Sequence, residues 1–351
     1  MHGKNSSLDS IDVAKFAMSI VIVAIHSGLG GNWQDSPIYP WARIAVPIFF
    51  VVSGFLFFRK FTVCDEQQKK SRLKKFVVRN MQLYAFWLVV LLVPTIVLRK
   101  YFADGIVVGL FKIIRGFFFG STFVASWYIV ATVIAVCVIV FLGKRIGNTP
   151  LFIGSAACYV FACLSCNYAN LFSSNEAITH LAEVVFPVFG VPYNNFVVAF
   201  LWIMIGKVFA EREDVIRESY SEARFRVVVW IALVVSCSLL FCEQSLIRSY
   251  SLAYTNDCYL LLPVPVILLF LIIINANICS SHAKTFRAAS TITYCFHGTF
   301  LTALRFLLGR YDFFDYGCLE FVLGLIISWG VTYAILKLEK KPAGKLLQYS
   351  H

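Results

Sequence analysis

The sequence has few charged side chains, and acidic ones are the scarcest. Charged residues make up 14% of the 351 residues, with 19 Asp and Glu and 31 Lys and Arg. Soluble domains contain about 25% charged residues. Hydrophobic residues make up 59%, and the mean hydropathy is +0.77. These values exclude a soluble globular protein and predict an integral membrane protein.

Several other patterns are missing, and each absence removes a class of protein. No ten-residue segments of alternating hydrophobicity indicate an outer-membrane β-barrel. No repeat, low-complexity tract or soluble region is evident, which predicts one membrane domain over residues 1–351 without an added soluble domain. The net charge of +12 comes without a nucleic-acid recognition motif. Most of the 11 cysteines fall in apolar segments, so we expect structural cysteines and no metal site.

The apolar runs are about 18–23 residues long, the length that an α-helix needs to cross a bilayer. They predict an all-α, polytopic membrane helix bundle of about ten transmembrane helices. The expected spans are residues 11–30, 40–58, 80–99, 122–143, 150–167, 193–210, 226–243, 257–277, 287–308 and 316–337.

The basic residues are distributed in a way that orients this bundle. Residues 59–79 contain eight Lys and Arg, and residues 207–226 and the tail contain more, whereas residues 29–39 and 168–192 contain none. With ten spans, every basic-rich segment falls on one side. Because Lys and Arg gather in cytoplasmic segments, both termini are expected to be cytoplasmic, with anionic membrane lipid as a partner.

Three ionisable residues, Asp12, Lys15 and His26, lie on the first span, where such groups are costly and therefore indicate a function. Lys15 and His26 are eleven residues apart, which at ~100° per residue places them on nearly one helix face and ~16 Å apart in depth. A cation near one surface and an imidazole near the other suit the movement of a group across the bilayer. Asp12 is expected to pair with Lys15, three residues on.

The predicted topology sorts the polar residues of the spans into two layers, which a polar tunnel through the bundle would explain. Each of these residues also has a structural interpretation, as an interfacial anchor or a hydrogen-bonded core group. The inner layer comprises Lys15, Ser290 and Tyr294, above the basic residues Arg72, Lys75 and Arg79. The outer layer comprises His26, Arg43, Trp127, Asn194, Asn195 and Arg305, and His297 lies between the layers.

If His26 is a general base, it needs an orienting partner. About 21 Å of helix separates it from Asp12, which excludes that carboxylate. Glu320, one turn into the last span, is the first candidate, and Glu243 and Asp257 are alternatives that the sequence does not separate.

These residues follow an order that resembles the acyltransferase-3 family of ten-helix membrane acyltransferases. The family opens with an Asp, an Arg three residues later and a His eleven residues after the Arg, and Asp12, Lys15 and His26 match this pattern. Its second signature, an Arg followed by Val-Pro-hydrophobic-Phe and Ser-Gly, matches Arg43 and residues 46–54.

Two further signatures follow in the same order. A Gly-rich turn before a Trp-aromatic pair matches residues 116–120 and 127–128. A Ser-x3-Tyr-x2-His pattern matches Ser290, Tyr294 and His297.

The resemblance extends over about residues 8–337, with one departure. Lys15 stands where the family has an Arg, so the charge is kept but the planar, two-pronged guanidinium is lost.

The resemblance implies an enzyme that transfers an acyl group, most often acetyl, from cytoplasmic acetyl-CoA or another acyl-CoA to a hydroxyl group. The acceptor would be a cell-surface glycan or a related extracytoplasmic molecule, and the protein would lie in the bacterial inner (cytoplasmic) membrane. The alternative is a transporter of a small polar solute such as serine, because a resembling membrane domain occurs in membrane-bound serine racemases.

The expected roles follow from the two layers and the resemblance. His26 would take a proton from the acceptor or take the acyl group itself, and Arg43 or Arg305 would stabilise the oxyanion. The residues expected to be catalytic are His26, Arg43 and Glu320. Those expected to bind the donor are Lys15, Arg72, Lys75, Arg79, Ser290 and Tyr294. Those expected to bind the acceptor are Trp127, Asn195, His297 and Arg305.

Overall fold

The computed structural model describes the chain except for residues 1, 30–35, 37, 99, 101, 120, 121, 124, 125, 254 and 309–315. The described residues form helices and no strands. The first α-helices are α1 (His2–Ser27), α2 (Tyr39–Ala42), α3 (Ala45–Phe61), α4 (Glu66–Leu98), α5 (Ile106–Phe119), α6 (Trp127–Ile146) and α7 (Asn148–Leu164). They are followed by α8 (Glu176–Phe189), α9 (Phe196–Glu211), α10 (Glu213–Ser221), α11 (Ala223–Ser249), α12 (Pro263–Asn275), α13 (Ala283–Leu308) and α14 (Tyr316–Leu338). Short 3-10 helices are η2 (Ala169–Phe172), η3 (Pro192–Asn194) and η4 (Pro342–Ser350).

Each of the ten predicted spans coincides with a helix, which confirms the all-α class. Six described helical segments are long and apolar enough to cross a membrane, and they contain α3, α4, α6, α9, α11 and α14. Two shorter apolar helices are α7 and α12. The last two of the ten predicted spans correspond to α1 and α13, which contain Asp12, Lys15 and His26 and Ser290, Tyr294 and His297, respectively. The count of ten and the orientation of the termini stay predictions.

The basic segment at residues 59–79, expected to be a loop, is mostly helical. It forms the end of α3 and the polar first half of α4, which is 33 residues long and continues into an apolar half. Its Gln, Lys, Arg and Glu residues are good helix formers, and Pro94 is the first Gly or Pro in the helix. Side chains of the basic half therefore have a regular helical spacing.

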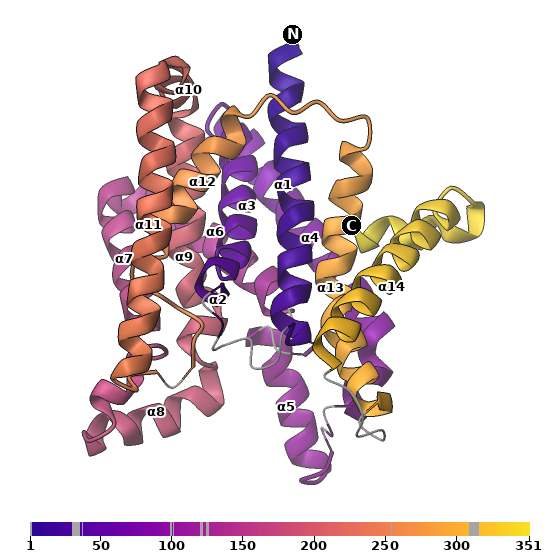
Figure 1. Ribbon diagram of the computed structural model, residues 1–351. Coiled ribbons are helices and arrows are strands. Elements are labelled where there is room, and N and C mark those ends of the chain that lie inside the picture. The colour runs from indigo at the N-terminus through magenta and orange to yellow at the C-terminus, as the bar shows by residue number, and fades with distance from the viewer. Residues whose placement is uncertain are drawn as a thin grey trace.

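Three helices outside the predicted spans, α5, α8 and α10, were missed. Figure 1 places α5 and α8 at one end of the bundle, and α10 with the N-terminus at the other. Gly190, with φ 80°, ends α8, and Asn195 caps α9 by accepting a hydrogen bond from the Val197 amide at 2.9 Å. The segment expected to be a Gly-rich turn is partly helical. Gly116 lies in the last turn of α5, and Gly120 lies outside the described residues.

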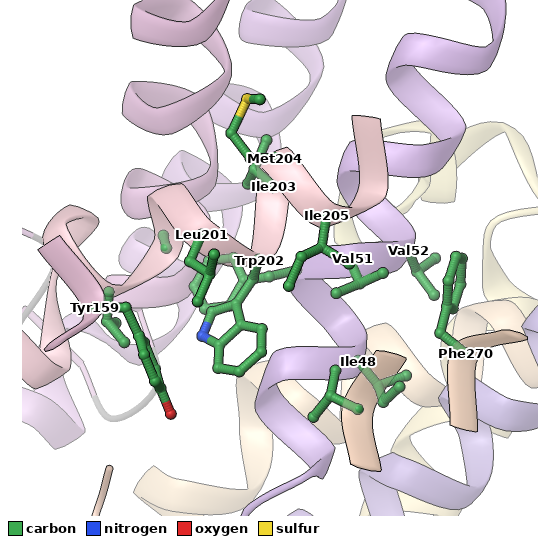
Figure 2. Packing of buried hydrophobic residues seen from close by; sticks show 14 of the residues in the cluster. Ile48, Val51, Val52, Tyr159, Leu201, Trp202, Ile203, Met204, Ile205 and Phe270 are labelled. Atoms are coloured by element: carbon green, nitrogen blue, oxygen red, sulfur yellow. The ribbon is translucent and has the colours of Figure 1, made fainter. Parts of the chain in front are cut away.

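A buried apolar cluster joins α3 to α7, α9 and α12 (Figure 2). Two glycines allow α3 and α9 to approach closely. A Cβ on Gly54 would lie 2.6 Å from the Ile203 carbonyl oxygen, and a Cβ on Gly206 would lie 2.3 Å from the Val51 carbonyl oxygen. In a membrane, such small residues let helix backbones pack without a hydrophobic driving force between them.

We expect Gly206→Ala to separate α3 from α9 and to lower the free energy of unfolding by about 1–3 kcal/mol, because the new methyl group meets backbone that cannot rotate away. The matched control is Gly154→Ala on α7, where a Cβ meets no atom within 4 Å. Thermal unfolding in detergent checks both. Equal unfolding temperatures for the two variants would contradict the assigned role of this contact.

Candidate functional site

A cavity of about 860 Å³ lies between α1, α3, α4, α6 and α13, and η4 contributes to its wall. It extends from Leu8 and Cys64, at the end of the bundle with the N-terminus, to Phe49 and Tyr294 deeper in the bundle. Its volume falls within the ~300–1,000 Å³ of small-molecule and cofactor sites.

The first half of α4 supplies three of the cations in the cavity wall. Arg72, Lys75 and Arg79 are spaced three and four residues apart, so they share one helix face, and all three line the cavity. Lys70 and Lys74 on the same helix are exposed and lie outside the lining. The helix thus sorts its basic residues into an inward and an outward set.

Two of the cavity's cations are neutralised by carboxylates. Arg59 pairs with Glu213 at 2.6 Å, and Arg287 pairs with Asp12. Within the described residues, no ion pair is formed by the other lining cations, which are Lys15, Lys60, Arg72, Lys75 and Arg79. The cavity therefore has a net positive charge that suits an anionic ligand.

Asp12 does not have the partner expected from the sequence. Its carboxylate is buried, and Arg287 of α13 donates to it from Nε at 3.0 and 3.1 Å and from Nη2 at 2.6 Å. A forked guanidinium satisfies both carboxylate oxygens, which one ammonium cannot do as well. The Lys15 ammonium instead lies 5.5 Å from the centre of the Phe49 ring and lines the cavity.

Three aromatic rings, those of Phe49, Tyr128 and Tyr294, form the deep end of the cavity. We call them the aromatic floor. Their ring centres lie 5.1–6.0 Å apart, and the Tyr128 hydroxyl is bonded to the Phe49 carbonyl oxygen at 3.0 Å and to Ser53 Oγ at 2.6 Å. Ser290 is fully buried outside the lining, and its hydroxyl donates to the Arg287 carbonyl oxygen at 2.8 Å.

Two histidines lie beyond this floor. The centre of the His297 ring is 6.1 Å from that of Tyr294 and 5.0 Å from that of His26. His26 is exposed, whereas His297 is fully buried. The structure therefore brings His26, His297 and Tyr294 close together.

Glu320, the first candidate partner of the His26 ring, is engaged with Arg305 instead. Both of its carboxylate oxygens accept hydrogen bonds from Arg305 Nε at 2.9 and 3.0 Å, and one also accepts from Nη2. The same Nη2 donates to the backbone carbonyl oxygen of His26. Glu320 thus acts on the end of α1 through Arg305.

The two alternative partners for His26 are engaged elsewhere as well. Asp257 pairs with Arg43, whose Nε also donates to the Asn256 carbonyl oxygen at 3.2 Å. Glu243 accepts hydrogen bonds from the Tyr168 hydroxyl and from backbone amides at residues 260 and 261.

Two residues expected to contact the acceptor have structural contacts of their own. The Trp127 ring packs 5.5 Å from the ring centre of Phe50. Asn195 is buried, and besides capping α9 it donates to the Phe189 carbonyl oxygen at 3.4 Å.

The segment η4 has a place at the cavity that the sequence does not indicate. The segment folds back on α4, where Trp87 Nε1 donates to the Ser350 carbonyl oxygen at 3.0 Å, and Tyr349 and His351 line the cavity. Its sequence reads as a short basic tail, and nothing in it signals this return. Among the described residues, no group of three or more His, Cys, Asp or Glu is placed to hold a metal ion.

A family model described as an acyltransferase domain matches residues 8–335, nearly the whole chain. The chain belongs to the acyltransferase-3 family. This confirms the resemblance drawn from the four signatures and supports a membrane acyltransferase.

Two similar curated proteins are both named amino-acid racemase and come from Enterococcus faecalis. One is 23% identical over 264 residues, which cover 74% of this chain and 35% of the relative. The other is 18% identical over 337 residues, which cover 95% of this chain and 46% of the relative. The chain thus spans less than half of either relative. No solved structure matches.

The docking of η4 is expected to weaken at acidic pH. Burial lowers the pKa of the His351 imidazole, and Arg79 adds to the lowering while Glu339 opposes it. A histidine whose pKa is lower in the docked state favours docking above its ordinary pKa of ~6.5 and opposes it as the pH falls below that value. Hydrogen exchange of residues 342–351, corrected for the intrinsic pH dependence, should be faster at pH 5.5 than at pH 7.5.

The control for this experiment is His351→Gln, in which the difference between the two pH values should shrink. A second control, His282→Gln, changes an exposed histidine outside the cavity and should leave the difference intact. Greater protection at pH 5.5 in the unchanged protein would contradict the assignment.

Proposed function

We propose that this protein transfers an acyl group, acetyl in the first instance, from cytoplasmic acyl-CoA to a hydroxyl group on the other side of the membrane. The observation that carries the proposal is the cationic cavity, whose deep end lies next to the histidine pair. A donor with an anionic head and a reactive end fits a site with positive charge at one end and a base at the other.

The cations of α4 would bind the phosphates of the donor. Arg72 and Arg79 can each bind a phosphate with two parallel hydrogen bonds, and Lys75 adds a compact charge between them. Lys15 lies deeper, beside Phe49, where it would contact the pantetheine arm. With Lys in place of the family's Arg, that contact is made by one ammonium group and not by a fork.

The reaction would then take place at the histidine pair. His26 would remove the proton of the acceptor hydroxyl while the hydroxyl oxygen attacks the thioester carbon. An acyl-histidine intermediate is the alternative route. Arg43 and Arg305 each keep Nη1 outside the hydrogen bonds described above, so either could donate to the developing oxyanion.

The acceptor is proposed to be a sugar hydroxyl of a cell-surface glycan, with the protein in a bacterial cytoplasmic membrane and its termini on the donor side. A second candidate function is passage of a small polar solute such as serine through the bundle, and the name of the two relatives, amino-acid racemase, points to an amino acid as that solute. Dependence on acyl-CoA separates the two functions.

His26→Ala should lower the rate of transfer by roughly 10²–10⁴-fold, the contribution that a general base makes. The measurement uses vesicles that contain the purified protein, with labelled acetyl-CoA on the side of residues 59–79 and a glycan acceptor on the other side. His180→Ala, an exposed histidine on α8, is the matched control and should transfer normally. Transfer by His26→Ala at the normal rate would exclude the mechanism, and amino-acid uptake without acetyl-CoA turnover would favour the second candidate.

Replacing a cation of α4 should weaken donor binding and leave the chemical step intact. We expect Lys75→Ala and Arg79→Ala each to raise the KM for acyl-CoA by about tenfold at unchanged kcat, since each removes one charge-assisted hydrogen bond to phosphate. Lys74→Ala, on the outward face of the same helix, is the control and should leave KM unchanged. An equal rise in KM for Lys74→Ala would show a general effect of charge and not a binding site.

A further inference from the structure

The contacts of His297 determine which of its ring nitrogens carries the proton. Nδ1 lies 2.8 Å from the Tyr294 carbonyl oxygen and 3.0 Å from the Thr293 carbonyl oxygen. A carbonyl oxygen only accepts hydrogen bonds, so Nδ1 must be the N–H donor. In the neutral ring Nε2 then holds a lone pair, and its hydrogen-bonding capacity is that of an acceptor.

This Nε2 is buried and has no hydrogen-bond partner within the described residues. Leaving such an acceptor unpaired is costly, so an unpaired one in a functional region indicates a group that arrives or turns toward it. The neighbouring imidazole is that of His26, with ring centres 5.0 Å apart and the planes tilted by 45°. Two imidazoles joined by one N–H···N hydrogen bond have ring centres roughly 5 Å apart, given an N···N distance of ~2.9 Å.

The two rings are not hydrogen-bonded as they stand. We infer that a small rotation of the His26 ring brings one of its N–H groups to Nε2 of His297, and that this hydrogen bond fixes which nitrogen of His26 faces the acceptor hydroxyl. His297 is then a positioning residue for the base and not an acceptor-binding residue. The role of His297 in catalysis rests on the proposed acyl transfer. The hydrogen bond between the two histidines does not depend on that proposal.

The steps balance with His297 as a constant hydrogen-bond acceptor. The free nitrogen of His26 takes the hydroxyl proton as the oxygen–carbon bond forms at the thioester, and the carbon–sulfur bond breaks. The departing CoA thiolate takes that proton from His26, so the products are an ester and a thiol. While His26 is an imidazolium, the bond to His297 stabilises its charge, as the third member of a catalytic triad does.

The charged groups near His26 are the guanidinium groups of two arginines, Arg43 and Arg305. Arg43 precedes α3, and Arg305 lies on α13, while the carboxylates of Asp257 and Glu320 are already bound to those two guanidinium groups. Among the described residues, no free carboxylate is therefore placed to orient the His26 ring. This leaves His297 as the group with the required acceptor atom.

The test compares His297→Ala with His297→Gln in the vesicle assay. His297→Ala should lower kcat by roughly 100-fold while the KM for acyl-CoA changes less than about twofold, because the base loses its orientation while the donor cavity is unchanged. In His297→Gln, the amide oxygen can replace the Nε2 acceptor and should restore kcat to within roughly tenfold of normal. Thr302→Ala, which removes a hydroxyl bonded to its own helix at Gly298, is the matched control and should not change kcat.

A second measurement reads the hydrogen bond without activity. The ¹⁵N chemical shifts of His26 in histidine-labelled protein should report a single tautomer in the unchanged protein and in His297→Gln, and a mixture in His297→Ala. The inference is overturned if His297→Ala keeps its kcat, if His297→Gln binds acyl-CoA but is as slow as His297→Ala, or if the His26 tautomer is the same in all three. If the unchanged protein transfers no acyl group, the proposed function fails, and the NMR comparison alone decides whether the two histidines are bonded.

Discussion

A charge inside an apolar membrane bundle requires a partner, and the arrangement of this protein depends on how that requirement is met at α13. Near its start, Arg287 binds Asp12 of α1, and near its end Arg305 binds Glu320 of α14 and the carbonyl oxygen of His26. The helix is thus fixed against α1 at both ends. The residues between, which include Tyr294 and His297, are held opposite the face of α1 that presents Lys15 and His26.

Much of the fold could be predicted because lipid imposes one simple requirement. A segment that crosses the bilayer must be apolar for about 20 residues and helical, so length and hydropathy locate it. The same requirement does not apply to α5, α8 and α10, which are short and lie in the connections. The charges of the polar half of α4 suggest a cytoplasmic loop, although its many Gln, Lys, Arg and Glu residues favour a helix.

The sequence singles out several residues that lie close together in the structure, but it does not predict their pairings. Lys15 and His26 stood out because ionisable groups are rare in apolar spans, and the face they share follows from helical geometry. The predicted partner of Asp12, Lys15, is wrong. Lys15 is close along the chain, whereas the actual partner, Arg287, is 275 residues away. The pairing of Glu320 could not be predicted either. Its hydrogen bonds with Arg305 depend on how α13 packs against α14, which the periodicity of the sequence does not encode. The lone pair on His297 depends on one tautomer and can be seen only from its contacts.

The aromatic floor also has a consequence for the cell that contains this protein. A water-filled route from one face of a membrane to the other would conduct protons and dissipate the gradients that the membrane maintains. Phe49, Tyr128 and Tyr294 interrupt such a route with closely packed rings, and the hydrogen bonds of Tyr128 hold that ring in place. In the proposed transfer, an extended pantetheine arm would part these rings only narrowly and would itself fill the gap. In the proposed transfer, the aromatic floor would therefore let a reactive group reach the histidine pair while the bundle stays closed to ions.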